Sequence, residues 1–435
     1  MTSPDWHALH AANDEFVRRH PGERVERQPV QSFIEGAQHF RADTIPSIGR
    51  RALEALEHYA SDGVALARAM AFGGRERDFA DDVHRRVTRK LASEPVEDYR
   101  IDFEDGFGAH SDAVEDAEVI RCADLTAAAM QQETLPPSFG IRVKPLTREL
   151  APRSLQTTDL FVQTVLGATG GTLPPNFIVT LAKVTTTEQV AYFARHLEVL
   201  EQRLRLPERT LRMEIMVETA RAVMDWDGRC PLPSYVDAAR GRLVAASLGT
   251  YDYTAALGIT AAYQRQRHPA CEHARLVMQL AFAGTGVRVS DGSTAILPVE
   301  PVERMYDAWR LHSGDVRHAL KMGIYSGWDL HPAQLVSRYA AVYAFYLTGL
   351  EPASRRLTTF LEAASRGDAP RDIADDVATG QALLNFILRA IACGAADCVE
   401  TASLTGLPVD LLDGRPFREL LVGLHITTEA QRPQR

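Results

Sequence analysis

Short apolar runs alternate with longer amphipathic stretches along most of the chain. From about residue 29 to residue 345, runs of apolar and β-branched side chains are separated by segments whose apolar residues recur every three or four positions. The first kind of run is typical of buried parallel strands, and the second of the helices that connect them. We expect eight strands, at residues 30–34, 99–103, 140–143, 176–181, 212–217, 243–248, 286–289 and 323–325.

The connecting stretches have one apolar face, as crossover helices do. Residues 187–204, for example, place Val190, Phe193 and Leu197 on one stripe. Eight strand–helix units that close on themselves form a (β/α)8 TIM barrel, so the expected fold class is α/β. An open, doubly wound sheet is the alternative. Residues 60–97 are too many for one crossover and predict an inserted helical excursion.

The pattern changes near both ends of the chain. After residue 346 only helical patterns remain, at residues 354–366 and 371–393, which predicts a C-terminal helical appendage to the barrel. We therefore divide the chain into an N-terminal helical segment (1–28), a catalytic TIM barrel (29–345) and a C-terminal helical region (346–435).

Composition and charge narrow the class of protein. Hydrophobic residues make up 45% and charged residues 24% of the 435 residues, which is typical of soluble globular proteins. The formal net charge of −9 would repel a phosphate backbone, so nucleic acid is not an expected partner. No apolar run reaches the roughly 18 residues of a membrane span. The five scattered cysteines contain no Cys-x-x-Cys pair, and we expect a cytoplasmic protein.

Charged side chains follow five consecutive strands of the expected barrel. The carboxyl ends of the strands form one face of a TIM barrel, where catalytic groups gather. Burying charges there is costly unless they pair or bind a metal ion, so these side chains suggest a site. They are Asp102, Glu104 and Asp105 near the second strand, Arg142 and Lys144 at the third, Lys183 after the fourth, Glu218 after the fifth and Asp252 after the sixth.

Two of these carboxylates, Glu218 and Asp252, are candidate magnesium ligands. Mg²⁺ commonly takes one or two protein carboxylates and leaves positions for water and for substrate oxygens, such as those of a 2-oxo acid. Each residue also has a structural alternative. Asp105 or Ser111 could simply start the helix after the second strand, and Asp252 could cap the next turn. Arg142 and Lys183 could be cations that only pair with these acids.

One histidine, His331, follows the eighth expected strand and is placed at the edge of the site, with Pro332 opening the next helix. Two glycine-rich stretches, 167–171 and 283–286, do not continue into a nucleotide-binding motif and are interpreted as loops. The other histidines considered are expected on loops or helix surfaces: His110, His268, His273, His312 and His318.

Six short motifs occur in one order at these strand ends, over roughly residues 29 to 340. Together they resemble the citrate lyase β-subunit, malyl-CoA lyase and HpcH/HpaI aldolase superfamily, and within it an aldolase-like branch. The motifs are Asp102-Phe103-Glu104-Asp105, Ile141-Arg142-Val143, Leu181-Ala182-Lys183-Val184, Met216-Val217-Glu218-Thr219-Ala220-Arg221-Ala222, Leu248-Gly249-Thr250-Tyr251-Asp252-Tyr253-Thr254 and Trp328-Asp329-Leu330-His331-Pro332-Ala333-Gln334.

The resemblance implies a Mg²⁺-dependent barrel enzyme, with Mn²⁺ as the alternative ion. It implies that Glu218 and Asp252 bind the metal and that Arg142 holds the oxygens of a 2-oxo acid or enolate. It also implies a homo-oligomer. The expected catalytic residues are Arg142, Lys183, Asp102, Glu104 and Asp105, and the expected substrate-binding residues are Arg142, Gly249, Thr250, Tyr251 and His331.

The resulting expectation is a carbon–carbon lyase or aldolase that acts on a 2-oxo or hydroxy acid through a metal-stabilised enolate. An acyl-CoA enzyme like malyl-CoA lyase or malate synthase is the first alternative, and a non-catalytic metabolite-binding barrel is the second. Ile34-Glu35-Gly36-Ala37 replaces the turn with which CoA-using relatives contact their ligand, which speaks against a CoA thioester. The general base stays open between a metal-bound water, His331 and an acid from a neighbouring subunit.

Overall fold

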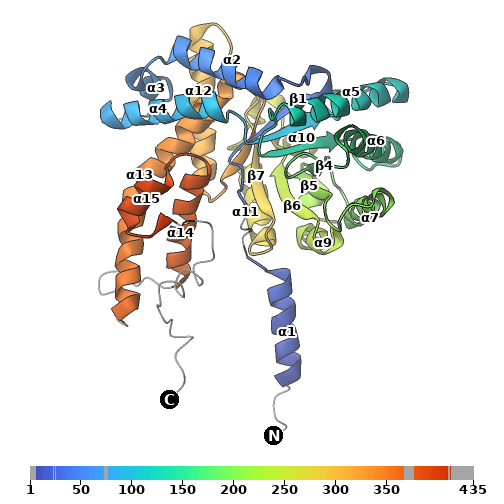
Figure 1. Ribbon diagram of the computed structural model, residues 1–435. Helices are drawn as coiled ribbons and strands as arrows, with labels where there is room; N and C mark the ends of the chain where they lie inside the picture. The colour runs from blue at the N-terminus through green and yellow to red at the C-terminus, as the bar shows by residue number, and fades with distance from the viewer. Residues whose placement is uncertain are drawn as a thin grey trace.

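Eight parallel strands close into a barrel in the order of the chain (Figure 1). This computed structural model describes residues 6–22, 24, 26–72, 77–366, 377–409 and 412. The closed sheet confirms the TIM barrel and excludes the open doubly wound alternative. The strands are β1 Ser32–Gly36, β2 Asp98–Asp102, β3 Ser138–Val143, β4 Ile178–Leu181, β5 Arg212–Val217, β6 Leu243–Leu248, β7 Arg288–Ser293 and β8 Ser326–Asp329.

The strand bounds agree with the predicted ones best at β5 and β6, where they coincide. The prediction for the eighth strand, residues 323–325, is wrong. Gly323 has a φ of +82° and forms the turn that follows α12, so the extended backbone of β8 begins only at Ser326. Gly can adopt this left-handed conformation without the steric cost that a Cβ would add.

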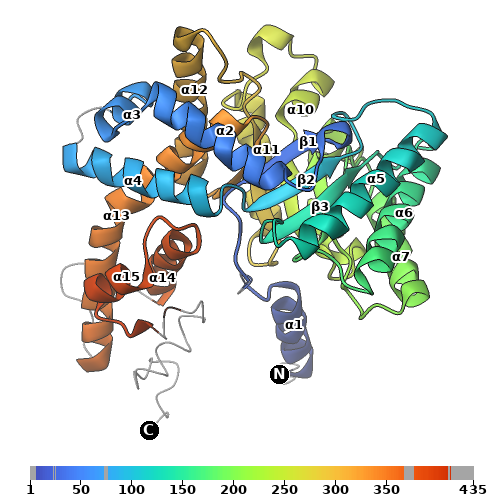
Figure 2. The same cartoon turned by 45° about the horizontal axis from the view of Figure 1, so that its top comes forward.

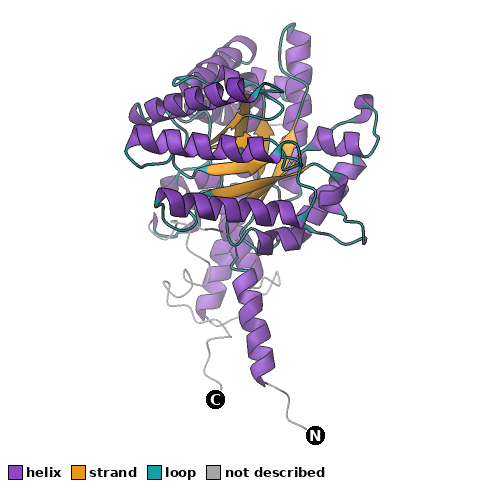
Figure 3. Cartoon of the chain, turned by 90° about the vertical axis from the view of Figure 1, so that its right-hand side faces the viewer, coloured by secondary structure: helices purple, strands orange, loops and turns teal. Residues whose placement is uncertain are grey.

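Helices surround the barrel on its outside (Figure 3). Figure 2 shows α5, α6 and α7 next to one another along one flank. Val190, Phe193 and Leu197 of α7 are buried against the barrel, as the apolar stripe predicts. The bounds are α2 Thr44–Tyr59, α5 Asp112–Gln131, α6 Ala151–Thr169, α7 Thr187–Leu204, α8 Ala220–Val223, α9 Leu232–Ala238, α10 Thr250–Ala256, α11 Pro269–Phe282 and α12 Val302–Lys321, with short 3-10 turns η1 Ala37–His39 and η2 Ala261–Tyr263.

The helical excursion expected before the second strand consists of α3 Gly63–Ala69 and α4 Arg77–Ser93. α4 packs on α2 and on α13, the long helix that follows β8. The excursion therefore joins the first helix of the barrel to the C-terminal part of the chain.

The described helices α1, α13 and α14 extend from the barrel on the same side (Figure 1). α1 Trp6–Arg19 projects away from the barrel and contains no buried residue. α13 Pro332–Arg366 continues without a break through residue 346, and α14 Val377–Ala392 and α15 Cys398–Thr405 pack on it. The division into three parts at residues 28 and 345 stays a prediction. None of the described helices is both long and apolar enough to cross a membrane.

A network of ion pairs ties α4 to the segment that enters β1. The carboxylate of Glu94 accepts hydrogen bonds from Arg27 Nη1 at 2.9 Å and from Lys90 Nζ at 2.6 Å. Burial opposes ionisation of Glu94, but Arg27 and Lys90 outweigh it and lower the pKa of Glu94 from 4.5 to about 2. A carboxylate with a lowered pKa in the folded protein stabilises the fold at neutral pH.

We expect Glu94→Gln to lower the free energy of unfolding by about 1 kcal/mol at pH 7, a modest value because the side chain is one-third exposed. The contribution is complete above the ordinary pKa of 4.5 and is lost as the pH falls toward 2. Urea unfolding at pH 7 and pH 3 measures it, with the exposed Glu351→Gln as the control. A deficit in Glu94→Gln that is the same at both pH values would contradict the role of the ion pairs.

Candidate functional site

Charged side chains from four consecutive strands meet at the carboxyl end of the barrel. Asp102 is the last residue of β2, Arg142 lies near the end of β3, Lys183 follows β4 by two residues, and Glu218 comes directly after β5. Hydrogen bonds and ion pairs join these residues to Glu104, Asp105 and Asp252. We call these seven residues the mouth network.

Arg142 is fixed in the mouth network by two parallel hydrogen bonds. Its Nε donates to Asp102 Oδ1 at 2.7 Å and its Nη2 to Asp102 Oδ2 at 2.5 Å, and the guanidinium lies 5.6 Å from the centre of the Trp328 ring. Burial opposes the positive charge, but Asp102 and Glu104 keep the pKa of Arg142 above its usual value. The arginine is therefore a fixed and permanent cation with a defined orientation.

Lys183 connects three strand ends to one another. Its ammonium is 2.6 Å from Glu104 Oε1, 2.8 Å from Asp105 Oδ2 and 3.0 Å from Asp252 Oδ2. Its φ of +49° is left-handed, a conformation that costs a non-glycine residue roughly 1 kcal/mol. In this conformation the backbone N–H of Lys183 donates to Glu218 Oε1 at 2.7 Å.

Glu218 is the most deeply buried acid next to Lys183, with 2% of its surface exposed. Burial raises the pKa of Glu218 to about 7, with a further contribution from Asp252, while Arg142 and Lys183 oppose the shift. Gly249 makes room for this carboxylate, because a Cβ at residue 249 would lie 2.2 Å from Glu218 Oε2. The position therefore excludes any larger side chain unless Glu218 moves.

We expect Gly249→Ala to destabilise the fold by about 1 to 3 kcal/mol, since the added methyl group must displace the buried side chain of Glu218. Thermal unfolding measures the loss of stability. Gly167→Ala is the matched control, because nothing lies within 4 Å of a Cβ at this position in α6. Equal stability of the two variants would show that Glu218 is not confined by Gly249.

The mouth network carries more negative than positive charge. Five carboxylates, those of Asp102, Glu104, Asp105, Glu218 and Asp252, face two cations. Among the described residues no group of three or more His, Cys, Asp or Glu forms a ready ligand set for a metal ion. A site of two carboxylates plus water and substrate oxygens suits Mg²⁺, so Glu218 and Asp252 fit this ion.

Neither Asp105 nor Asp252 caps a helix, whereas Ser111, the other candidate for the start of α5, does. Ser111 stands at the N-cap of α5, six residues beyond Asp105. Gly249 stands at the N-cap of α10, and Asp252 lies in its first turn and is not a cap. Both acids instead bind the Lys183 ammonium, as the ion-pair alternative for the lysine expects.

Lys144, Tyr251 and His331 form hydrogen bonds outside the mouth network, and the Thr250 hydroxyl has no hydrogen-bond partner among the described residues. Lys144 donates to Glu115 Oε2 at 2.8 Å. The Tyr251 hydroxyl accepts from the backbone N–H of Ala295 at 2.6 Å, and Thr250 is buried against Gly292. His331 precedes α13, and its Nδ1 accepts a hydrogen bond from the backbone N–H of Ala333. Pro332 is the first residue of α13, as predicted. Their roles in substrate binding stay predictions.

The burial of the His312 side chain was not predicted from the sequence. His312 was expected on a surface, but it is 1% exposed and lies between β8 and the helices α12 and α13. Its Nε2 is 3.0 Å from Asp329, which Arg338 also binds at 2.8 Å. The signal was its position on the stripe of α12 that contains the buried Trp309 and Val316.

Comparison with known proteins places the chain in a family. A family described as "Domain of unknown function (DUF6986)" matches residues 9–420. The chain belongs to the DUF6986 family. No curated protein matches this DUF6986 chain.

Comparison with solved structures found several that are similar to this DUF6986 chain. A citrate lyase from Burkholderia xenovorans LB400 is 19% identical, with a TM-score of 0.55 over 87% of this chain and 96% of that chain. A malate synthase from Haloferax volcanii with magnesium and glyoxylate is 15% identical, with a TM-score of 0.48 over 90% and 99%. An HpcH/HpaI aldolase/citrate lyase family protein from Burkholderia cenocepacia J2315 is 13% identical, with a TM-score of 0.38 over 79% and 98%. The citrate lyase likeness confirms the expected resemblance at the level of the fold.

Proposed function

We propose that this protein is a Mg²⁺-dependent lyase or aldolase that makes or breaks a carbon–carbon bond in a 2-oxo or hydroxy acid. Mn²⁺ is the alternative ion. The observation that carries the proposal is the mouth network, in which an excess of carboxylates surrounds a fixed arginine at the end of the barrel where catalytic groups gather. Such an arrangement is suited to a cation and an anionic substrate together.

A divalent ion held by Glu218 and Asp252 would supply Lewis-acid polarisation of the 2-oxo group. The protein's own contribution begins with Arg142. The Nε and Nη2 atoms of Arg142 donate hydrogen bonds to Asp102. The N–H groups on Nη1 remain to bind a substrate carboxylate. Because Arg142 is fixed before the substrate arrives, it stabilises developing negative charge without rearranging.

Lys183 has a positioning role in this proposal. Burial lowers its pKa, but its carboxylate partners raise it above the usual value, so the ammonium stays protonated at neutral pH. A permanently charged lysine is not a general base. It holds Glu104 and Asp252 near one another, and its backbone N–H orients the Glu218 carboxylate.

Calorimetric titration of the metal-stripped protein tests the proposal. Mg²⁺ is added alone and then with pyruvate, oxaloacetate or glyoxylate, and each titration is repeated on Asp252→Asn. We expect an oxo acid to bind only with the metal, and the variant to lose this binding. Asp237→Asn, at an acid paired with Arg19 near the other end of the barrel, is the matched control.

Two outcomes would redirect the assignment. If the folded protein binds neither the metal nor any of the oxo acids, the lyase proposal fails and a non-catalytic barrel takes its place. If CoA or acetyl-CoA binds in a parallel titration, the acyl-CoA enzyme becomes the better description.

A further inference from the structure

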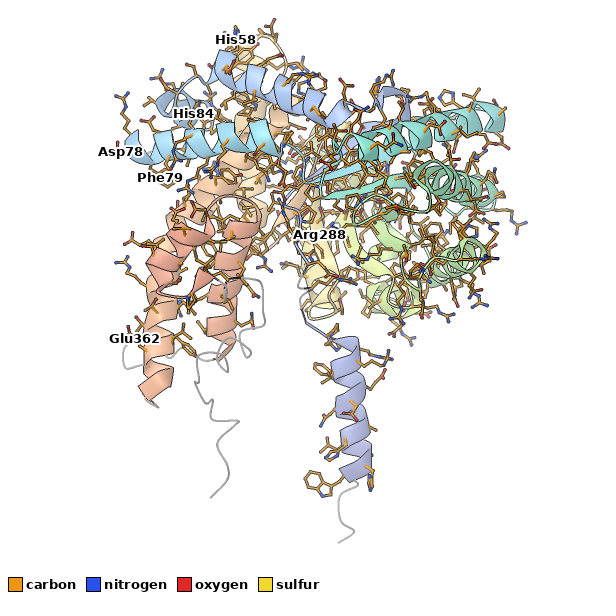
Figure 4. The ribbon with its side chains drawn as sticks, viewed as in Figure 1. His58, Asp78, Phe79, His84, Arg288 and Glu362 are labelled. Atoms are coloured by element: carbon orange, nitrogen blue, oxygen red, sulfur yellow. The ribbon has the colours of Figure 1, made fainter. Side chains whose placement is uncertain are left out.

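A cavity of about 250 Å³ lies at the end of the barrel opposite to the mouth network. It is bounded by the first residues of β7 and β8, by the turn before β7, by the segment that enters β1 and by α13 and α14. Figure 4 labels Arg288, the first residue of β7, which lines this cavity. We call it the lower cavity.

The charged side chains among the described lining residues of the lower cavity are all cations. Three arginines, Arg24, Arg288 and Arg389, line it, and the described residues that line it include no aspartate or glutamate. Arg24 donates from Nε to the backbone oxygen of Gly286 at 2.9 Å, which fixes it beside the turn before β7. The lower cavity is therefore lined by cations from three separate parts of the chain.

Arg288 has hydrogen-bonding capacity that the described protein does not use. Its Nη1 donates to Gln28 Oε1 at 3.2 Å, but its Nε and Nη2 are shielded from solvent and have no acceptor within the described ranges. Burial lowers the pKa of Arg288, and Asp98 and Glu214 inside the barrel offset this only in part. A buried guanidinium edge without a partner is rare, and it points to an acceptor other than the described residues.

The lower cavity also contains aromatic side chains. Tyr346 is completely buried, and its hydroxyl has no hydrogen-bond partner in the part of the chain that the structure describes. The guanidinium of Arg389 lies 4.1 Å from the centre of the Tyr325 ring. Tyr325 and Tyr346 therefore give the lower cavity an aromatic wall beside Arg288.

We propose that the lower cavity binds a small organic anion, in which a phosphate or carboxylate group is attached to an aromatic or apolar body. The acidic group pairs with Arg288 and Arg389, whose planar guanidinium groups match the oxygens of either anion. The body packs on Tyr325. A volume of about 250 Å³ has room for about eight water-sized groups, since a water molecule in the liquid takes roughly 30 Å³, and this suits a small organic anion.

Calorimetry with phenyl phosphate and benzoate as probes tests this site and distinguishes the two acidic groups. Benzyl alcohol, which has a similar body and no charge, serves as the neutral probe. We expect Arg288→Gln and Arg389→Gln each to weaken binding of the preferred anion at least tenfold. The exposed Arg304→Gln should bind as the unchanged protein does. If Arg288→Gln unfolds, Arg389→Gln still tests the site, because Arg389 lies on α14, outside the barrel.

The results are independent of the proposed lyase function, because the two sites lie at opposite ends of the barrel. Saturating Mg²⁺ and pyruvate should leave binding of the probe unchanged. The proposal is overturned if neither anion binds, if benzyl alcohol binds as tightly, or if Arg288→Gln and Arg389→Gln retain full affinity. If Mg²⁺ and pyruvate compete with the probe, the anion binds at the mouth network and not in the lower cavity. This result would also overturn the proposal.

Discussion

Glu218→Gln is expected to lower the affinity for Mg²⁺ by at least about 100-fold. Loss of a group that only orients a metal ligand typically costs 10- to 100-fold in affinity, so loss of a proposed ligand should exceed this range. The amide keeps the shape of the side chain and can still accept the N–H of Lys183, so we expect the variant to fold. The affinity is measured by calorimetry on metal-stripped protein.

The matched control for this experiment is Glu188→Gln, which changes an exposed glutamate in the first turn of α7 at the same end of the barrel. Its affinity for Mg²⁺ should equal that of the unchanged protein. An unaltered affinity in Glu218→Gln, together with an unaltered fold by circular dichroism, would remove Glu218 from the metal site.

The second large effect is on stability. Arg142→Met is expected to lower the free energy of unfolding by about 3 to 5 kcal/mol, because it leaves the Asp102 carboxylate without its main cation. Asp102 is only 2% exposed, so water cannot replace the guanidinium. Its remaining acceptors are needed by the backbone N–H groups of Glu104 and Gly106, which hold the loop after β2.

Urea unfolding of the single and double variants separates this effect from loss of packing. The double variant Asp102→Asn/Arg142→Met should recover at least half of the lost stability, because no unpaired charge is then buried. Arg304→Met, at an exposed position of α12, should change stability little. If the two single changes simply add in the double variant, the Asp102–Arg142 pair is not energetically coupled.

The barrel itself could be predicted because its strands carry a strong local signal. β5 and β6 are mostly apolar segments between polar ones, interrupted only by Glu214 and Ser247 after their first residues, and their predicted bounds coincide with the observed ones. The eighth strand has no such run. Gly327 and Asp329 interrupt it, and the buried Ile324 before it belongs to the preceding turn. Its place is decided by pairing with β1 and β7, which a local pattern does not contain.

The mouth network was predictable for a topological reason. Parallel strands end at the same face of the barrel. Asp102, Arg142 and Glu218 therefore come together whatever conformation the loops adopt. The directions of Tyr251 and His331 depend instead on their loop conformations. Tyr251 bonds to Ala295, which is 44 positions away in the chain. The burial of His312, by contrast, had a local signal, because His312 lies on the same stripe of α12 as the buried Trp309 and Val316.

Closure of the barrel by β1 and β8 has a consequence for folding. Ser32 pairs with Trp328, so the last gap in the sheet closes only when residues about 300 positions apart meet. Contacts between such distant segments make folding slow, since the entropy of loop closure is lost before the pairing is formed. A chain still emerging from the ribosome, without β8, holds an open sheet with two unpaired edges, and such edges favour aggregation. Emergence of β8 from the ribosome therefore sets the moment at which the sheet can close and lose both unpaired edges.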